Sequence, residues 1–237
     1  MTIELLTERP SRDGGRLGWH RHHKPENRNF PVASALAPAT ALSAKSWKRA
    51  RTPLNQGQLG SCTGNACEVM AYERPSHVAA VTKTEAQAVA LYKKATQLDA
   101  VPGAYPPTDT GSTTVGVLAA AKAAAYIGSY RWAFAFTEAQ QTLAQLGPLI
   151  TGVEWYEGFD NPKSNGELVI AGQVRGGHEL CLDQIDPNAP GWGGNGVVVG
   201  WNSWGPTWGP LGGRFIWSFA TWRKLLEAGG EVGIGLS

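Results

Sequence analysis

The chain of 237 residues has a net charge of +2, with 42% hydrophobic and 17% charged residues, which are ordinary values for a folded globular protein. The small net charge gives no reason to expect a nucleic-acid partner or binding to an anionic membrane. The length is enough for a sizeable core, in one domain or in two lobes that share an interface.

The N-terminus and the cysteines indicate a reducing setting. The opening residues, MTIELLTERPSRDGG, lack the basic start and long apolar run of a secretion signal or a membrane span. The sequence supports no pairing among Cys62, Cys67 and Cys181, so we expect three reduced thiols. We therefore expect a cytoplasmic protein, or one of the host cytoplasm or the virion if the source is viral.

Residues 1–45 are polar and then rich in proline and alanine, which predicts an N-terminal arm ahead of a folded domain at 46–237. The arm carries a basic, histidine-rich patch made of Arg12, Arg16, His20, Arg21, His22, His23 and Lys24. A zinc site is conceivable, but no cysteine accompanies the histidines and their spacing fits no closed tetrahedral site. We expect a solvated arm laid over the domain, with no metal and no cofactor.

Glycines and small polar residues at 55–61 lead to Cys62, after which apolar residues follow at helical spacing. This pattern predicts a loop that enters a buried helix running from Cys62 to about Tyr72. A helix N-terminus carries partial positive charge, so a thiol placed there ionises more easily and becomes nucleophilic. The amide of Gln56, six residues earlier, could donate to an oxyanion beside the sulfur. A lone cysteine at a helix start is nevertheless more often a small buried apolar residue.

The rest of the first half is predicted to be helical. Capping boxes at Thr84–Gln87 and Thr137–Gln140 each open a helix, and the second helix stops at Leu146–Pro148. An alanine-rich helix is expected at about Val115–Ala125, after a loop rich in proline, glycine, aspartate and threonine.

The second half changes to short β-branched and aromatic runs separated by glycines. The predicted strands are Leu149–Trp155, Leu168–Ile170, Glu179–Ile185, Gly196–Trp201, Arg214–Phe219 and Val232–Leu236, with a short helix at Thr221–Ala228. A helical first half (about 46–147) and an antiparallel second half (about 148–237) predict an α+β protein with two lobes.

Two segments of the second half carry polar groups that could complete a reactive site. His178 follows two glycines and enters a predicted strand, which would hold the imidazole at a fixed edge, although such a histidine is more often structural. Residues 202–209 read NSWGPTWG, in which two tryptophans, each followed by glycine, could cover a polar group and exclude water. The alternative interpretation is an aromatic turn cluster.

These motifs resemble those of the papain-like cysteine peptidases. Residues 56–63, QGQLGSCT, resemble the family pattern QGxCGSCW, and residues 202–209 closely resemble its NSWGxxWG signature. The order Gln, Cys, His, Asn is also that of the family, with His178 lying 116 residues and Asn202 140 residues after Cys62. The resemblance covers roughly residues 46–220 and is weak between the motifs.

The resemblance implies a papain-like two-lobe fold, with a helical N-terminal half packed on an antiparallel β-sheet or barrel. It implies a cysteine peptidase, of a compact bacterial or viral type, that acts on peptide or protein substrates. Two positions depart from the family pattern. Leu59 replaces a cysteine, which removes its usual disulfide, and Thr63 replaces a tryptophan; neither change removes a reacting group.

The resemblance also implies roles for individual residues. Cys62 and His178 would form a thiolate–imidazolium pair, Asn202 would orient the imidazole, and Gln56 would donate to the oxyanion. Residues that correspond to the family's substrate contacts are Gly111 and Ser112 for backbone pairing, Gly152 and Gly177 for a side-chain pocket, and Trp204 as a shield of the histidine. Because the pocket positions hold glycines, a wide or shallow pocket is expected.

Two other functions remain open from the sequence. One is a catalytically silent papain-fold protein that binds or scaffolds a partner. The other uses the same residues for transpeptidation, deamidation or cleavage of cell-wall peptides. The sequence does not indicate an oligomeric state.

Overall fold

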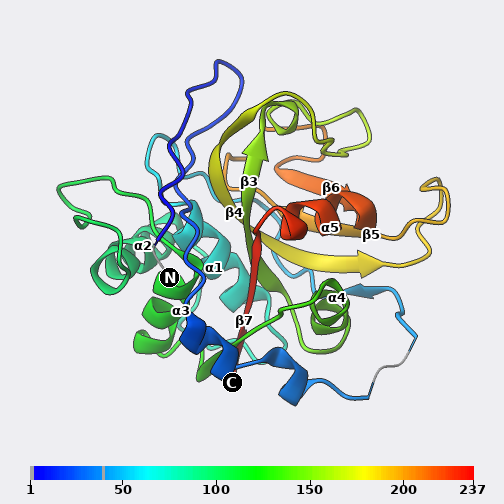
Figure 1. Cartoon of the computed structure of the whole chain (residues 1–237), viewed down its shortest axis with the longest axis horizontal. Helices are drawn as coiled ribbons and strands as arrows, with labels where there is room; N and C mark the ends of the chain where they lie inside the picture. The colour runs from blue at the N-terminus through cyan, green and yellow to red at the C-terminus, as the bar shows by residue number, and fades with distance from the viewer. Residues whose placement is uncertain (1–2, 39–40) are drawn as a thin grey trace.

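The computed structural model describes residues 3–38 and 41–237 and confirms the α+β class. Figure 1 shows α1–α3 gathered beside an antiparallel sheet, with the N-terminal segment in blue running between those helices and the sheet. The helices are α1 (Cys62–Glu73), α2 (Glu85–Leu98), α3 (Thr114–Ala123), α4 (Phe136–Gln145) and α5 (Phe219–Glu227), with short 3-10 turns at Pro25–Asn29, Val32–Ala35 and Glu157–Phe159.

The strands form one antiparallel sheet in the order β2-β7-β3-β4-β5-β6, with β1 paired to β4. They are β1 (Lys45–Ser46), β2 (Ser129–Trp132), β3 (Leu149–Tyr156), β4 (Val174–Asp186), β5 (Val197–Trp201), β6 (Arg214–Ser218) and β7 (Glu231–Leu236). β2 comes from the half that was predicted to be helical, and β4 is longer than predicted because its first residues still pair with β3.

Two local predictions were wrong. Leu168–Ile170 is not a strand; Leu168 makes a single backbone hydrogen bond to Ile216 of β6. Thr137 does not cap α4, because the helix already begins at Phe136. The residue at the N-cap position is Ala135, and no side chain caps the helix. By contrast, the Thr84 hydroxyl accepts the Gln87 N–H at the start of α2, as the first capping box predicts.

The sheet separates two hydrophobic cores. Successive residues of a strand point to opposite faces, and so Leu149 packs in the core on the α4 and α5 side while Ile150 packs against α1 and α3. Leu180 and Cys181 of β4 divide in the same way, and all three cysteines are free and buried. Each face of the sheet therefore needs its own helical layer.

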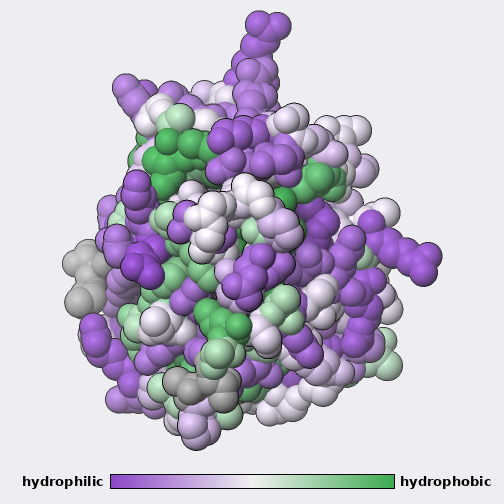
Figure 2. Space-filling view, turned by 90° about the vertical axis from the view of Figure 1, so that its right-hand side faces the viewer, coloured by the Kyte–Doolittle hydropathy of each residue, from purple (hydrophilic) through white to green (hydrophobic). Residues whose placement is uncertain are grey.

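The predicted solvated arm is instead packed against the domain. Leu17 and Trp19 are among the most deeply buried side chains, at 1% and 0% exposure, and His22 is buried as well. On the face drawn in Figure 2, apolar side chains form scattered patches separated by polar ones. Within the described residues, no helix has the length and apolar character required to cross a bilayer.

A buried polar cluster ties α1 to the sheet. Arg214 of β6 donates to both carboxylate oxygens of Asp183 on β4, at 2.9 and 2.6 Å. The indole N–H of Trp201 lies 3.0 Å from both Asp183 and Glu73, the last residue of α1. Burial and the nearby charge of Asp183 raise the pKa of Glu73, so the cluster holds one cation against one full carboxylate charge.

We predict that Asp183→Ala lowers the free energy of unfolding by about 3–5 kcal/mol, because Arg214 would be left buried without its carboxylate partner. Urea unfolding measures the change. The exposed Asp13→Ala is the matched control and should shift stability by less than about 0.5 kcal/mol. Equal stability of the two variants would show that the cluster is not a structural tie.

Candidate active site

Cys62 is the first residue of α1, where the sequence predicts it. Its side chain is fully buried, and the sulfur lies against the backbone N–H groups of Thr63 and Glu179. Burial raises the pKa of the Cys62 thiol to about 12, and the two N–H groups offset only part of this effect. With the arm in place, the thiol is therefore neutral at pH 7.

His178 and Asn202 form a short, buried polar contact. His178 Nε2 lies 2.7 Å from Asn202 Oδ1, and both residues are buried. The same oxygen accepts the backbone N–H of Ser203 at 2.7 Å, which identifies it as the acceptor end of the amide. Nε2 must therefore carry the proton, and Nδ1 is left as the basic nitrogen of the ring.

The basic Nδ1 atom of His178 is buried and has no hydrogen-bond partner among the described residues. Burial lowers the pKa of His178 to about 4, with Asn202 working against this shift and Arg175 adding to it. The covered site thus holds a neutral imidazole and a neutral thiol, whereas the sequence analysis expects an ion pair.

Two tryptophans enclose the imidazole. The ring of Trp204 lies 5.1 Å from that of His178, and the ring of Trp155 lies 4.8 Å away on an edge-to-face approach. Trp155 is itself held by Asp160, which accepts its indole N–H at 2.8 Å. Trp204 was predicted as a shield; Trp155 was not, because nothing in its strand sequence distinguishes it from a core residue.

The amide of Gln56 is oriented by its neighbours. Ser203 donates its hydroxyl to Gln56 Oε1 at 2.5 Å, which turns Nε2 to the other side, where it donates to the Leu59 carbonyl at 2.7 Å. An amide nitrogen has two protons, so one N–H of Gln56 remains after this bond. Ser203 is a second positioning residue that the sequence analysis missed.

The arm lies in the cleft between α3 and the sheet. Ser112 N–H donates to Gly18 O at 2.8 Å, and His20 N–H donates to Ser112 O at 2.9 Å, which makes a short parallel pairing around Trp19. On the sheet side, Trp19 N–H donates to Gly177 O at 2.9 Å. The arm backbone is therefore bound from both walls, as an added strand would be.

All five predicted substrate contacts touch this arm. A Cβ on Gly152 or Gly177 would overlap Trp19, and a Cβ on Gly111 would stand 2.5 Å from Gly18 O. Ser112 provides the pairing described above, and Trp204 donates its indole N–H to Arg16 O at 3.1 Å. We call these five the cleft residues. The arm occupies the place that the sequence analysis assigns to a substrate.

No group of three or more histidine, cysteine, aspartate or glutamate side chains suited to a metal ion occurs in residues 3–38 or 41–237. In particular, the histidines of the arm point to different partners: His20 Nε2 contacts Thr110 O at 2.8 Å, and His23 contacts Glu231 at 3.3 Å.

Comparison with known proteins agrees with this geometry at the level of fold. No protein-family model matches the sequence, and a search of curated proteins finds no match. Solved structures do match over almost the whole chain. Xylellain, a cysteine protease from Xylella fastidiosa, is 14% identical with a TM-score of 0.68, over 98% of this chain and 99% of its own.

Two further matches are a procathepsin B from Trypanosoma congolense and a procathepsin L 3 from the larval midgut of Tenebrio molitor. The first is 10% identical with a TM-score of 0.61, over 98% of this chain and 86% of its own. The second is 12% identical with a TM-score of 0.59, over 95% and 76%. The chain has the papain-like fold.

Within this papain-like fold, the predicted reactive residues come from four separate places: the loop before α1, the start of α1, β4 and the end of β5. The structure brings His178 and Asn202 into contact and seats Cys62 against the backbone of the residue after His178. The amide of Gln56 points to Leu59. The predicted thiolate–imidazolium contact is not made while the arm is bound.

We predict that Trp19→Ala speeds alkylation of Cys62 by iodoacetamide at pH 7 at least about tenfold, because losing a buried tryptophan weakens arm docking by about 3–5 kcal/mol. A return of the thiol pKa from about 12 to its ordinary 9.0 would by itself raise the thiolate fraction about a thousandfold. Mass spectrometry locates the label.

The control variant for this prediction is Phe30→Ala, which removes an exposed aromatic ring of the arm, away from the cleft. It should label at the rate of the parent protein. If Trp19→Ala also labels at the parent rate, the arm does not control access to Cys62.

Proposed function

We propose that the chain is a cysteine peptidase that hydrolyses peptide bonds through Cys62, His178 and Asn202, with Gln56 as an oxyanion donor. The observation that carries this proposal is the double acceptance by Asn202 Oδ1, which leaves His178 with a protonated Nε2 and a basic Nδ1. A general base needs such a free, oriented ring nitrogen.

In the proposed reaction, His178 Nδ1 takes the proton of the Cys62 thiol once the cleft is open. The sulfur then attacks the carbonyl carbon of the peptide bond, and the negative charge that develops on the oxygen is stabilised by the Cys62 N–H and the remaining N–H of Gln56. His178 returns its proton to the leaving amine as the C–N bond breaks. Water hydrolyses the thioester, and the thiol is restored.

The arm supplies the inactive state of this peptidase. It contacts all five cleft residues, in a structure where Cys62 and His178 are fully buried and burial disfavours the charged form of each. Opening the cleft would readmit water and allow the ion pair, with the helix N-terminus supporting the thiolate. Two of the similar structures are proenzymes, a procathepsin B and a procathepsin L 3, in keeping with a covered site.

We predict that Trp19→Ala hydrolyses peptides and that adding Cys62→Ala abolishes the activity, because no other group can form the thioester. Adding Cys67→Ala, which removes a buried thiol of the same helix, should leave most of the activity. A peptide library read by mass spectrometry measures the products. Hydrolysis that survives Cys62→Ala would refute the proposal, and thioester or amide products in place of acids would favour acyl transfer.

Replacing Asn202 tests the observation on which the proposal rests. Asn202→Ala in the Trp19→Ala background should lower kcat without abolishing turnover. The imidazole could still accept and donate a proton, but its tautomer and orientation would no longer be fixed. Asn188→Ala, on an exposed turn, is the control. An unchanged kcat in Asn202→Ala would remove Asn202 from the mechanism.

Replacing Gln56 tests the oxyanion donor. In the same background, Gln56→Ala should lower kcat by about 10²–10³ with little change in KM, the loss expected for one preorganised donor. The neighbouring Gln58→Ala, which lies exposed in the same loop, should be neutral. A change in KM alone would show that Gln56 acts in binding and not on the transition state.

A further inference from the structure

The indole of Trp19 is inserted into a pocket between α3 and the sheet. The side chain is fully buried, lies over Gly152 and Gly177, and donates its N–H to Thr114 Oγ1 at 2.9 Å. The absence of side chains at both glycines makes the room for the ring. The pocket therefore has the volume of the largest natural side chain.

Two carboxyl groups flank this pocket. Gly152 of β3 pairs directly with Glu179 of β4 on one side and with Glu231 of β7 on the other. Residues opposite one another in an antiparallel sheet point to the same face. Because Gly152 faces Trp19, the side chains of Glu179 and Glu231 rise on either side of the indole. We call these two residues the carboxyl pair.

The carboxyl pair is buried and short of partners. Glu179 is 1% exposed and Glu231 is 5% exposed. Both carboxyl oxygens of Glu179 and one of Glu231 have no hydrogen-bond partner among the described residues. The hydroxyl of Thr114 lies near both groups but has a single proton to give. An indole offers one N–H, and that one is already used.

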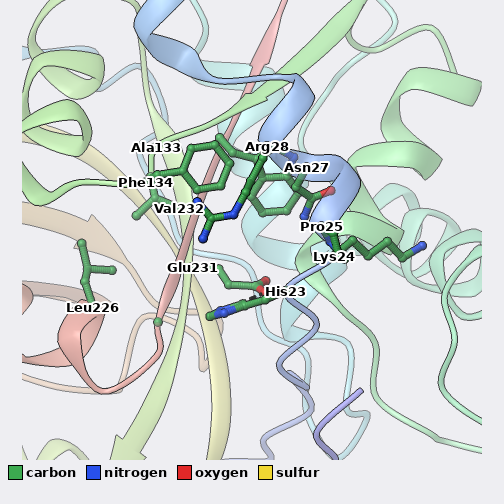
Figure 3. A pocket seen from close by; sticks show the side chains of 12 residues that line it. His23, Lys24, Pro25, Asn27, Arg28, Ala133, Phe134, Leu226, Glu231 and Val232 are labelled. Carbon is green, nitrogen blue, oxygen red and sulfur yellow. Dashed lines mark ion pairs between the residues drawn. The ribbon is translucent and has the colours of Figure 1, made fainter. Parts of the chain in front are cut away.

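Within the described part of the chain, basic residues lie near Glu231 and not near Glu179. Its Oε1 accepts the backbone N–H of His22 at 3.2 Å and lies 3.3 Å from His23 Nε2, and Figure 3 shows the His23 ring beside it. Burial raises the pKa of Glu231 to about 7 and that of Glu179 well above its ordinary value. The charge of Arg21 also acts on Glu231. No ion pair is made by Glu179 within residues 3–38 and 41–237.

The geometry points to a pocket that takes a basic side chain, arginine or lysine, of the substrate when Trp19 leaves it. This inference rests on the proposed function and names the substrate class of the same site. A guanidinium has five N–H donors and no acceptor, and it would reach the three orphaned oxygens from the volume that the indole vacates. A buried cation flanked by two carboxylates is compensated, whereas an apolar side chain leaves the oxygens unpaired.

The arm itself provides a test that needs no catalysis. In the full chain, Trp19→Arg places a cation in the pocket and Trp19→Leu places an apolar side chain there. Hydrogen exchange of the peptide covering residues 15–22 measures docking, because Trp19 N–H and His20 N–H are bonded to the cleft walls. We expect Trp19→Leu to exchange at least tenfold faster than Trp19→Arg.

Glu179→Gln, added to each of these variants, should remove most of the difference between arginine and leucine, while the exposed Glu227→Gln should leave it unchanged. The inference is overturned if Trp19→Leu docks as well as Trp19→Arg, or if the arginine advantage survives Glu179→Gln.

A second measurement tests the same pocket with substrates and does not require the arm to dock. Peptide libraries cleaved by Trp19→Ala should show at least a tenfold higher kcat/KM for arginine or lysine at one position, and Glu179→Gln should reduce this ratio. Cleavage with no preference for arginine or lysine would refute the inference about the pocket, while the proposed peptidase function would stand. No cleavage in any library contradicts the proposed function, and the exchange comparison still decides what the pocket prefers.

Discussion

The structure depends on one insertion: Trp19 of the arm enters between α3 and the sheet, with its backbone bonded to Ser112 on one wall and Gly177 on the other. The insertion is possible because both sheet positions beneath the indole are glycines, Gly152 and Gly177, where any side chain would overlap the ring. The two halves of the chain are therefore held together in this region by a third segment that comes from neither.

Burial explains the electrostatics of the whole site. Burial raises the pKa values of Cys62, Glu179 and Glu231 and lowers that of His178, so each group is driven towards its neutral form. In an open cleft these groups would be hydrated again. Cys62 and His178 would also be able to form their ion pair. In the proposed opening of the cleft, the departure of the arm would change several protonation states together.

The orienting bonds of the site, in contrast, contain no residue of the arm. Asn202 fixes the imidazole, and Ser203 both confirms the Asn202 oxygen as acceptor and turns the Gln56 amide. These contacts join β5 to β4 and to the loop before α1, all within the folded domain. The proposed catalytic residues are therefore preorganised while burial suppresses their charges, which is the combination that a covered peptidase requires.

The sequence by itself determined the local features: the helix that begins at Cys62, the Thr84 cap and most of the strands. It also singled out the four residues proposed here as reactive, because their motifs are short and contiguous. It could not identify Trp155 or Ser203, because a tryptophan in a strand and a serine in a turn have many ordinary uses. Nor could it show that the arm is buried, since a basic, proline-rich segment has no periodicity that reveals a partner surface. Only the tertiary structure decided that Trp19 lies over Gly152 and between Glu179 and Glu231, because these residues meet through strand register and not through sequence distance.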